Sequence, residues 1–167
     1  MANSHARQTE RKYTVRLAKA ADIPQVIAID AENTGMTKPE YWEDLLDIYN
    51  NRVSDADDDG QQKSVKRYRF FLVASDGDSV LGFIIGEVRA WEFGSPPCGW
   101  VFAIGVRDQI RQDGVGATLF EALTERFRKA GVNKVRTMLG RDATVIMSFF
   151  RSQGMMAGPF IQLEKDL

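Results

Sequence analysis

The chain has 167 residues, 44% of them hydrophobic, and its 22 lysines and arginines are matched by 23 aspartates and glutamates. This length supports one compact core and is too short for two ordinary domains, and the balanced charge argues against nucleic acid or an anionic membrane as a partner. No apolar run approaches the roughly 20 residues that span a bilayer, and residues 1–12 lack the apolar stretch of a secretory signal, so a cytoplasmic protein is expected.

The single cysteine, Cys98, and the single histidine, His5, restrict the chemistry further. One cysteine cannot form an internal disulfide, and a catalytic triad or a Cys–His pair would need His5 to leave the polar N-terminal segment and enter a cleft. A zinc site would lack its usual imidazole and thiolate ligands. We therefore expect no metal, and chemistry carried out by carboxylates, hydroxyls, backbone groups or a cofactor.

The N-terminal part of the chain predicts a strand and two helices after a flexible polar tail, residues 1–12. The strand covers 13–17, and Asp22 is placed to cap the first helix. Pro39 opens the second helix, in which apolar side chains recur at i, i+3, i+4 and i+7 and form one buried stripe: Trp42, Leu45, Leu46 and Tyr49. Residues 51–69 are rich in charged side chains, which favours a solvated connection.

A hairpin is predicted next, because an Asp-Gly-Asp turn at 76–78 is flanked by arms rich in β-forming apolar residues at 70–74 and 80–91. A break that contains glycine and proline at 94–97 precedes another apolar strand at 100–106. Three consecutive strands are therefore expected in the middle of the chain.

From Gly114 the hydrophobic period becomes helical, with one stripe formed by Val115, Leu119, Leu123 and Phe127. Gly131 is placed to end this helix. A strand at 135–139, a helix that Asp142 can cap and a last strand near 160–163 complete the chain. The predicted order of elements is β-α-α-β-β-β-α-β-α-β.

The most informative segment runs from Ala103 to Ala117, where a buried strand leads into a glycine loop that opens an amphipathic helix. The first N–H groups of a helix lack internal partners and lie at the positive end of its dipole, and Gly114 and Gly116 let a phosphate approach them closely. Arg111 adds a planar guanidinium that binds phosphate oxygens in pairs. The spacing is neither that of a P-loop nor that of a dinucleotide fingerprint. The segment predicts an anion site or, in the plainer alternative, a tight strand-to-helix turn.

The run Arg-Gln-Asp-Gly-Val-Gly-Ala at 111–117 resembles the Arg/Gln-x-x-Gly-x-Gly/Ala signature with which GNAT N-acyltransferases hold the pyrophosphate of acetyl-coenzyme A. The segments at 15–23, 80–86 and 149–155 are also similar to that family, so the resemblance covers 13–167. It implies a single GNAT acetyltransferase domain over these residues, with an α/β (α+β) fold. The implied sheet is central, mixed, mostly antiparallel and twisted, with about six or seven strands that splay between the fourth and fifth strands and about four flanking helices.

The resemblance also implies where acetyl-coenzyme A binds. The pyrophosphate is held by the glycine loop and its backbone amides, through Arg111, Gln112, Asp113, Gly114, Val115, Gly116 and Ala117. The preceding strand pairs with the pantetheine arm as an added strand would, through Ile104, Gly105 and Val106. Phe149 and Phe150 pack the last helix and shield the cofactor.

Acetyl transfer to an amine needs a neutral nucleophile, a stabilised oxyanion and departure of a thiolate. Family members often use a carboxylate base and a tyrosine acid, but Phe150 stands where many relatives carry tyrosine, and Ala143 where asparagine is common. Glu87 is the first candidate base because it interrupts an apolar strand, where burial raises the pKa of a carboxyl group; pairing with Arg89 or another cation is its alternative role. Asp142 is the second candidate base, and helix capping is its alternative role.

These features predict an acetyl-coenzyme A-dependent N-acetyltransferase that moves an acetyl group to a primary amine by direct transfer in a ternary complex. The acceptor is a protein N-terminal amine, a lysine amine or a small-molecule amine, and the sequence does not choose among them. Tyr41 lies off the buried stripe of the second helix and is the candidate to line the acceptor pocket. A homodimer is compatible with the sequence. The alternative is a non-catalytic acyl-coenzyme A-binding sensor, which the phenylalanine and alanine at 150 and 143 favour.

Overall fold

The computed structural model describes residues 13–50, 68–111 and 113–167. The expected flexible tail at 1–12, most of the expected solvated connection at 51–69, and Gln112 lie outside these residues. The chain divides into two compact units, one that ends at Thr137 and one that covers Met138–Leu167, and each is described by itself.

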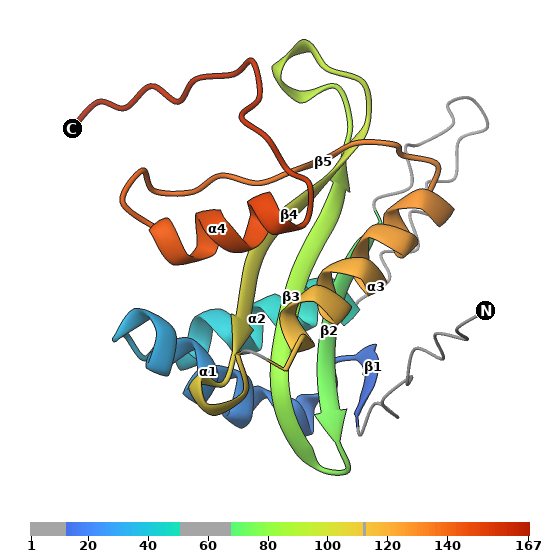
Figure 1. Cartoon of the computed structure of the whole chain (residues 1–167), viewed down its shortest axis with the longest axis vertical. Coiled ribbons are helices and arrows are strands. Elements are labelled where there is room, and N and C mark those ends of the chain that lie inside the picture. Colours follow the sequence, from blue (N-terminus) through green and yellow to red (C-terminus); the bar gives the residue numbers. More distant parts are fainter. Residues whose placement is uncertain (1–12, 51–67, 112) are drawn as a thin grey trace, which may run out of the picture. The chain divides into compact units, whose positions relative to one another are not determined.

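The first unit is built on a five-stranded sheet in the order β1-β2-β3-β4-β5 (Figure 1). The strands are β1 (Thr14–Leu17), β2 (Arg69–Asp76), β3 (Ser79–Arg89), β4 (Cys98–Val106) and β5 (Val135–Arg136). Neighbouring strands are antiparallel except β4 and β5, which are parallel. The predicted hairpin is confirmed: Asp76 pairs with Ser79, and Gly77 between them has a φ of 56° that suits glycine.

Helices cover both faces of this sheet. Helices α1 (Ile23–Thr34) and α2 (Pro39–Asn50) pack on one face and α3 (Val115–Lys129) on the other (Figure 1). The predicted stripe of α2 is confirmed, since Trp42 and Leu46 are buried with Phe71, Phe83 and Ile85 of the sheet. The Trp42 indole N–H also donates a 2.9 Å hydrogen bond to Asp30 of α1. The rings of this side chain are therefore buried in the core while its polar N–H group has a partner.

Glycines in the sheet let α3 approach β3 and β4 closely. A Cβ on Gly86 would lie 2.6 Å from the Trp100 carbonyl oxygen and 2.8 Å from the Phe127 ring of α3. A Cβ on Gly99 would lie 2.4 Å from the same ring. All three distances are shorter than real Cβ contacts, so the close contact of α3 with β3 and β4 depends on these two positions having no side chain.

Asp22 has a different role from the one its position suggested. The residue precedes α1, but its carboxylate makes no capping hydrogen bond to that helix. It accepts hydrogen bonds from both terminal nitrogens of Arg16, at 2.6 and 2.8 Å, and from the Lys19 amide at 2.9 Å. Burial opposes ionisation of this carboxyl, but the hydrogen bonds outweigh it and lower the pKa of Asp22. Asp22 therefore does not cap α1 with its side chain; it links β1 to the start of α1.

The second unit contains α4 (Thr144–Ser152), where a helix was predicted. Its N-cap residue is Ala143 and no side chain caps it, so the expectation that Asp142 caps this helix is wrong. The Asp142 backbone carbonyl accepts from the Thr144 amide instead, at 2.8 Å.

Within the described residues the sheet has five strands, fewer than the six or seven expected. Residues 160–163 form no strand, and the Ile161 and Leu163 side chains are more than four-fifths exposed. Strand β5 ends at Arg136 instead of continuing to 139, because the Thr137 side chain, and not its backbone, bonds to the Val101 carbonyl at 3.0 Å. A short apolar segment forms a strand only where a neighbouring backbone pairs with it.

The four helices match the expected number within the described residues. None of the helices described at 13–50, 68–111 and 113–167 combines the length and the apolar character that crossing a bilayer requires.

Candidate functional site

The junction between β4 and α3 carries the glycine motif. After Val106 the chain makes a 3-10 turn at Asp108–Ile110, and α3 begins at Val115. Gly114 caps the helix with a φ of 76°, in the left-handed region where a side chain costs about 1–2 kcal/mol. No atom lies within 4 Å of the position a Cβ would take there, so the space in front of the helix start is open.

The first amides of α3 are available to a ligand. Among the described residues, the N–H groups of Gly114, Val115, Gly116 and Ala117 have no hydrogen-bond acceptor. The amides on either side are engaged: the Asp113 N–H donates to Ile110 at 3.1 Å, and the Thr118 N–H donates to Gly114 at 3.0 Å. Four successive donors at the positive end of a helix dipole form a cradle suited to an anion, and the Asp113 amide serves the turn that precedes it.

Arg111 lies at this loop with part of its guanidinium occupied. One terminal nitrogen forms a 2.6 Å ion pair with Asp108 and a hydrogen bond with the Asn33 side chain of α1. The side chain is 46% exposed, and its remaining N–H groups have no partner within the described ranges. The guanidinium is thus held beside the cradle while it keeps donors for a phosphate.

Arg107 is a residue of this loop that the sequence patterns did not single out. Its Nε donates to the Val80 carbonyl at 2.7 Å, and its backbone N–H donates to Leu81 at 3.0 Å. A second side-chain nitrogen reaches Gln25 of α1 at 3.2 Å. These bonds fix the end of β4 to β3 and α1, and an arginine directly after a buried strand was the available signal.

Strand β4 has an unpaired edge next to the cradle. It pairs with β5 only at Gly99 and Trp100, and within the described residues the stretch toward Val106 pairs only with β3. The predicted separation of the fourth and fifth strands is therefore present. Phe102 is the extra residue of a bulge, because Ile85 pairs with Ala103 while the next residue of β3 pairs with Val101.

The residues expected to meet the pantetheine arm lie on this stretch. Ile104 and Val106 are partly exposed, whereas Gly105 is buried where a Cβ would meet the Phe83 ring at 2.5 Å. The outer edge of β4 here offers peptide groups that an amide-bearing ligand can pair with, as an added strand does.

Glu87 of β3 forms ion pairs with two arginines. Its Oε2 lies 3.3 Å from Arg69 Nε, and its Oε1 lies 2.8 Å from Arg89 Nε. The side chain is 18% exposed. Pairing with Arg89 was the alternative to a catalytic role, and it is observed. Tyr49 of α2 is close by: burial raises the pKa of its phenol, and the negative charge of Glu87 adds to the rise, so the hydroxyl stays protonated.

The other predicted residues lie as follows. Tyr41 is 49% exposed on α2, with its ring edge-on to Trp42, as its place off the buried stripe suggested. Cys98 is a buried free thiol. In the second unit, Phe149 and Phe150 pack edge to face at 5.1 Å. No three histidine, cysteine or acidic side chains in the described part of the chain are arranged to hold a metal ion.

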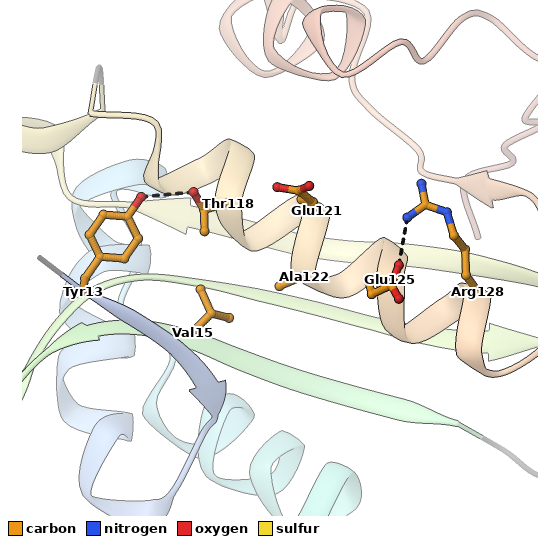
Figure 2. Close-up of a pocket in the computed structure, with 7 residues that line it drawn as sticks. All are labelled: Tyr13, Val15, Thr118, Glu121, Ala122, Glu125 and Arg128. Atoms are coloured by element: carbon orange, nitrogen blue, oxygen red, sulfur yellow. Dashed lines mark hydrogen bonds and ion pairs between the residues drawn. The ribbon is translucent and has the colours of Figure 1, made fainter. Parts of the chain in front are cut away.

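A cavity of about 480 Å³ lies between β1 and α3 (Figure 2). In the strand order of the sheet, β1 is separated from β4 by β2 and β3. Tyr13 and Thr118 close one end with a 3.1 Å hydrogen bond, and the carboxylates of Glu121 and Glu125 line the wall. Arg128 also lines this cavity and pairs with Glu125 at 3.3 Å, which leaves the carboxylate of Glu121 without a cation in the cavity wall. One uncompensated negative charge disfavours a diphosphate, so this cavity suits the predicted cofactor less well than the start of α3 does.

Comparisons with known proteins agree with this geometry. A family model described as the acetyltransferase (GNAT) family matches residues 36–155. No curated protein sequence matches the chain. Because the family model covers well over half of the sequence, the chain belongs to the acetyltransferase (GNAT) family.

Solved structures show the same fold. A transcriptional regulator from Bacillus halodurans C-125 has a TM-score of 0.72 and 14% identity, over 93% of this chain and 99% of that chain. An aminoglycoside 6'-N-acetyltransferase from Acinetobacter haemolyticus has a TM-score of 0.70 and 13% identity, over 92% and 99%. A ribosomal-protein-alanine N-acetyltransferase from Brucella melitensis biovar Abortus 2308 has a TM-score of 0.67 and 16% identity, over 93% and 99%. At these identities the likeness shows the fold alone.

Proposed function

We propose that the chain is an acetyl-coenzyme A-dependent N-acetyltransferase that transfers the acetyl group directly to a primary amine in a ternary complex. One observation carries the proposal: four successive amides, from Gly114 to Ala117, have no acceptor among the described residues, and they lie beside an edge of β4 that no described strand pairs with. Membership of the acetyltransferase family supports the same reaction.

In this proposal the amides of the cradle and the Arg111 guanidinium bind the diphosphate, and Arg111 exchanges Asn33 or Asp108 for a phosphate oxygen. The outer edge of β4 at Ile104–Val106 pairs with the amides of the pantetheine arm. The family resemblance supports two further roles: Gln112 as a ligand of the pyrophosphate, and Phe149 and Phe150 as a shield for the cofactor.

For this reaction the protein has to position the amine next to the thioester and to remove a proton from the amine. The neutral amine attacks the thioester carbonyl, the tetrahedral intermediate collapses, and the thiolate of coenzyme A leaves while the amine loses a proton. Because a thiol ionises near pH 8.5, only about 1.5 units above neutral pH, water suffices to protonate the sulfur in a chain with Phe150 at the usual tyrosine position. We propose Glu87, through water, as the proton acceptor, with Asp142 as the second candidate.

Replacing Glu87 with glutamine is expected to lower kcat/KM by about 100-fold and to change its pH profile, because the variant keeps the shape of the side chain but cannot accept a proton. The measurement is coenzyme A release from pH 6 to 9, with Glu121→Gln on the exposed face of α3 as the matched control. An unchanged rate and profile would remove Glu87 from the mechanism, and Asp142→Asn in the same assay then tests the second candidate.

The function itself is tested by thiol release on a panel of amines that includes peptides with free N-termini, lysine peptides and small amines. Turnover on any acceptor supports the transferase. Tight binding of acetyl-coenzyme A without turnover on every acceptor supports the second candidate function, a non-catalytic sensor, which Phe150 and Ala143 favour. The solved structure from Bacillus halodurans that shares this fold is described as a transcriptional regulator, which is a regulatory and not a catalytic role.

A further inference from the structure

Arg89 of β3 is held in one orientation by two neighbours. Its Nε donates to Glu87 Oε1 at 2.8 Å, and its guanidinium carbon lies 4.8 Å from the centre of the Phe102 ring. The side chain is 38% exposed, and its two terminal nitrogens have no hydrogen-bond partner among the residues the structure describes. An arginine that is stacked on an aromatic ring and anchored through Nε loses little side-chain entropy when a ligand binds. Its two terminal nitrogens, here called the outer fork, are free to donate to that ligand.

This cluster lies on the face of the sheet opposite α3. Gly86 and Gly99 face the Phe127 ring of α3, so Glu87 and Trp100, one residue further along each strand, face the other side. Arg89 is two residues beyond Glu87 and shares its face. Phe102 stacks on Trp100 at 6.4 Å and 15°, which places its ring in the same group.

The cluster also lies where the acetyl group is expected if the proposed function is correct, and the inference rests on that function. The diphosphate cradle follows β4, and the pantetheine arm pairs with Ile104–Val106, so the thioester end points back along β4 toward Phe102. At about 3.3 Å per residue, Phe102 is about 13 Å from Val106 along the strand. Glu87, the proposed proton acceptor, is the direct partner of Trp100 in the register of β3 and β4.

The charges of the cluster select an anion of modest charge. Arg69 and Arg89 share the single carboxylate of Glu87, so one positive charge is left uncompensated within this group. A carboxylate matches both the charge and the forked geometry of Arg89. A phosphate would bring a second negative charge beside Glu87, and a polycationic amine would be repelled by the two arginines.

We propose that the acceptor is a small amine that carries a carboxylate close to its amino group, as a free α-amino acid does. Its carboxylate binds the outer fork of Arg89, and its amino group lies toward Glu87, to which it gives up a proton through water as the acetyl group is transferred. The apolar part of the acceptor rests against Trp100. Arg89 is thus a specificity-determining residue for the reaction.

The test compares α-amino acids with their amides, which have the same amine and lack the carboxylate charge. Leucine, phenylalanine, glutamine and their amides are assayed for acetyl-coenzyme A-dependent thiol release. We expect the acids to exceed the amides in kcat/KM by at least about tenfold. In Arg89→Gln we expect kcat/KM for the acids to fall by about 10- to 100-fold, which is the usual contribution of a hydrogen bond to a charged group. We expect kcat/KM for the amides to change less than about twofold.

Arg128→Gln, which removes an exposed arginine of α3, is the matched control and keeps the preference for acids. Amides used as well as acids would overturn the inference, and so would an equal loss for both in Arg89→Gln, which would show that Arg89 only positions Glu87. If no acceptor is turned over, calorimetric binding of the same acids and amides to the coenzyme A-loaded protein gives the same comparison. If the wild-type protein does not bind coenzyme A at all, the proposed function itself is wrong. This result distinguishes a failure of the proposed function from a failure of the inference about Arg89.

Discussion

Replacing Gly114 with aspartate is expected to weaken acetyl-coenzyme A binding by at least about 100-fold without unfolding the protein. Gly114 is exposed, nothing occupies the space of its Cβ, and aspartate both tolerates a φ of 76° and is a favoured N-cap residue. The new carboxylate faces the place proposed for the diphosphate. At a separation of about 4 Å near a protein surface, each pair of like charges costs up to about 4 kcal/mol.

The matched variant is Gly114→Asn, which has the same shape, the same backbone demand and no charge. It also occupies amides of the cradle, so a loss of about tenfold is expected, and the further loss in the aspartate variant isolates the charge. Titration calorimetry measures both affinities, and thermal unfolding checks the fold. If the two variants bind equally well, the diphosphate does not lie at the start of α3.

Replacing Gly99 with alanine is expected to destabilise the protein by about 1–3 kcal/mol, which lowers the melting temperature by about 2–12 °C for a chain of this size. The added Cβ would lie 2.4, 2.6 and 2.7 Å from three atoms of the Phe127 ring, which is buried. Gly99 is also where β4 pairs with β5, through its N–H and the Lys134 carbonyl at 2.9 Å. The destabilisation therefore arises at the point from which β4 and β5 separate.

A double-mutant cycle with Phe127→Leu assigns this cost to one contact. All three close atoms belong to Phe127, so the smaller side chain relieves the overlap, and we expect a favourable coupling energy of at least about 1 kcal/mol. Gly158→Ala is the matched control, because nothing lies within 4 Å of its Cβ position, and its effect is expected within about 0.5 kcal/mol. Additive effects in the cycle would show that α3 does not pack on Gly99.

Local patterns predicted most of the fold because their causes are local. The period of Trp42, Leu45, Leu46 and Tyr49 produced α2 and its buried face. A glycine between a buried strand and an amphipathic stripe located the start of α3, where the left-handed residue is indeed Gly114.

Failures arose where the outcome depends on partners distant in sequence. The short run Phe-Ile-Gln-Leu at 160–163 suggested a strand, but no backbone pairs with it in the described structure. Aspartate is a favoured residue type for a helix cap, yet the carboxylate of Asp22 is bound by Arg16 and makes no hydrogen bond to the amides of α1. A single segment of sequence does not show which distant residue a side chain or a strand will pair with.

Glu87 illustrates the same limit within the candidate site. A carboxylate inside an apolar strand suggested a desolvated base, and its pairing with Arg89, two residues away, was readable as an alternative. The second arginine, Arg69, faces Glu87 only through the register of β2 and β3. The stacking of Arg89 on Phe102 likewise depends on the bulge in β4, which no pattern in the sequence announces.

The most direct measurement is a calorimetric titration of the wild-type chain with coenzyme A, with acetyl-coenzyme A and with S-acetylpantetheine, which lacks the adenosine nucleotide and, with it, the diphosphate. If the amides from Gly114 to Ala117 hold that group, both coenzymes bind with measurable heat and S-acetylpantetheine binds at least about 100-fold more weakly. No heat with either coenzyme, or equal affinity for the compound without a diphosphate, would contradict the account.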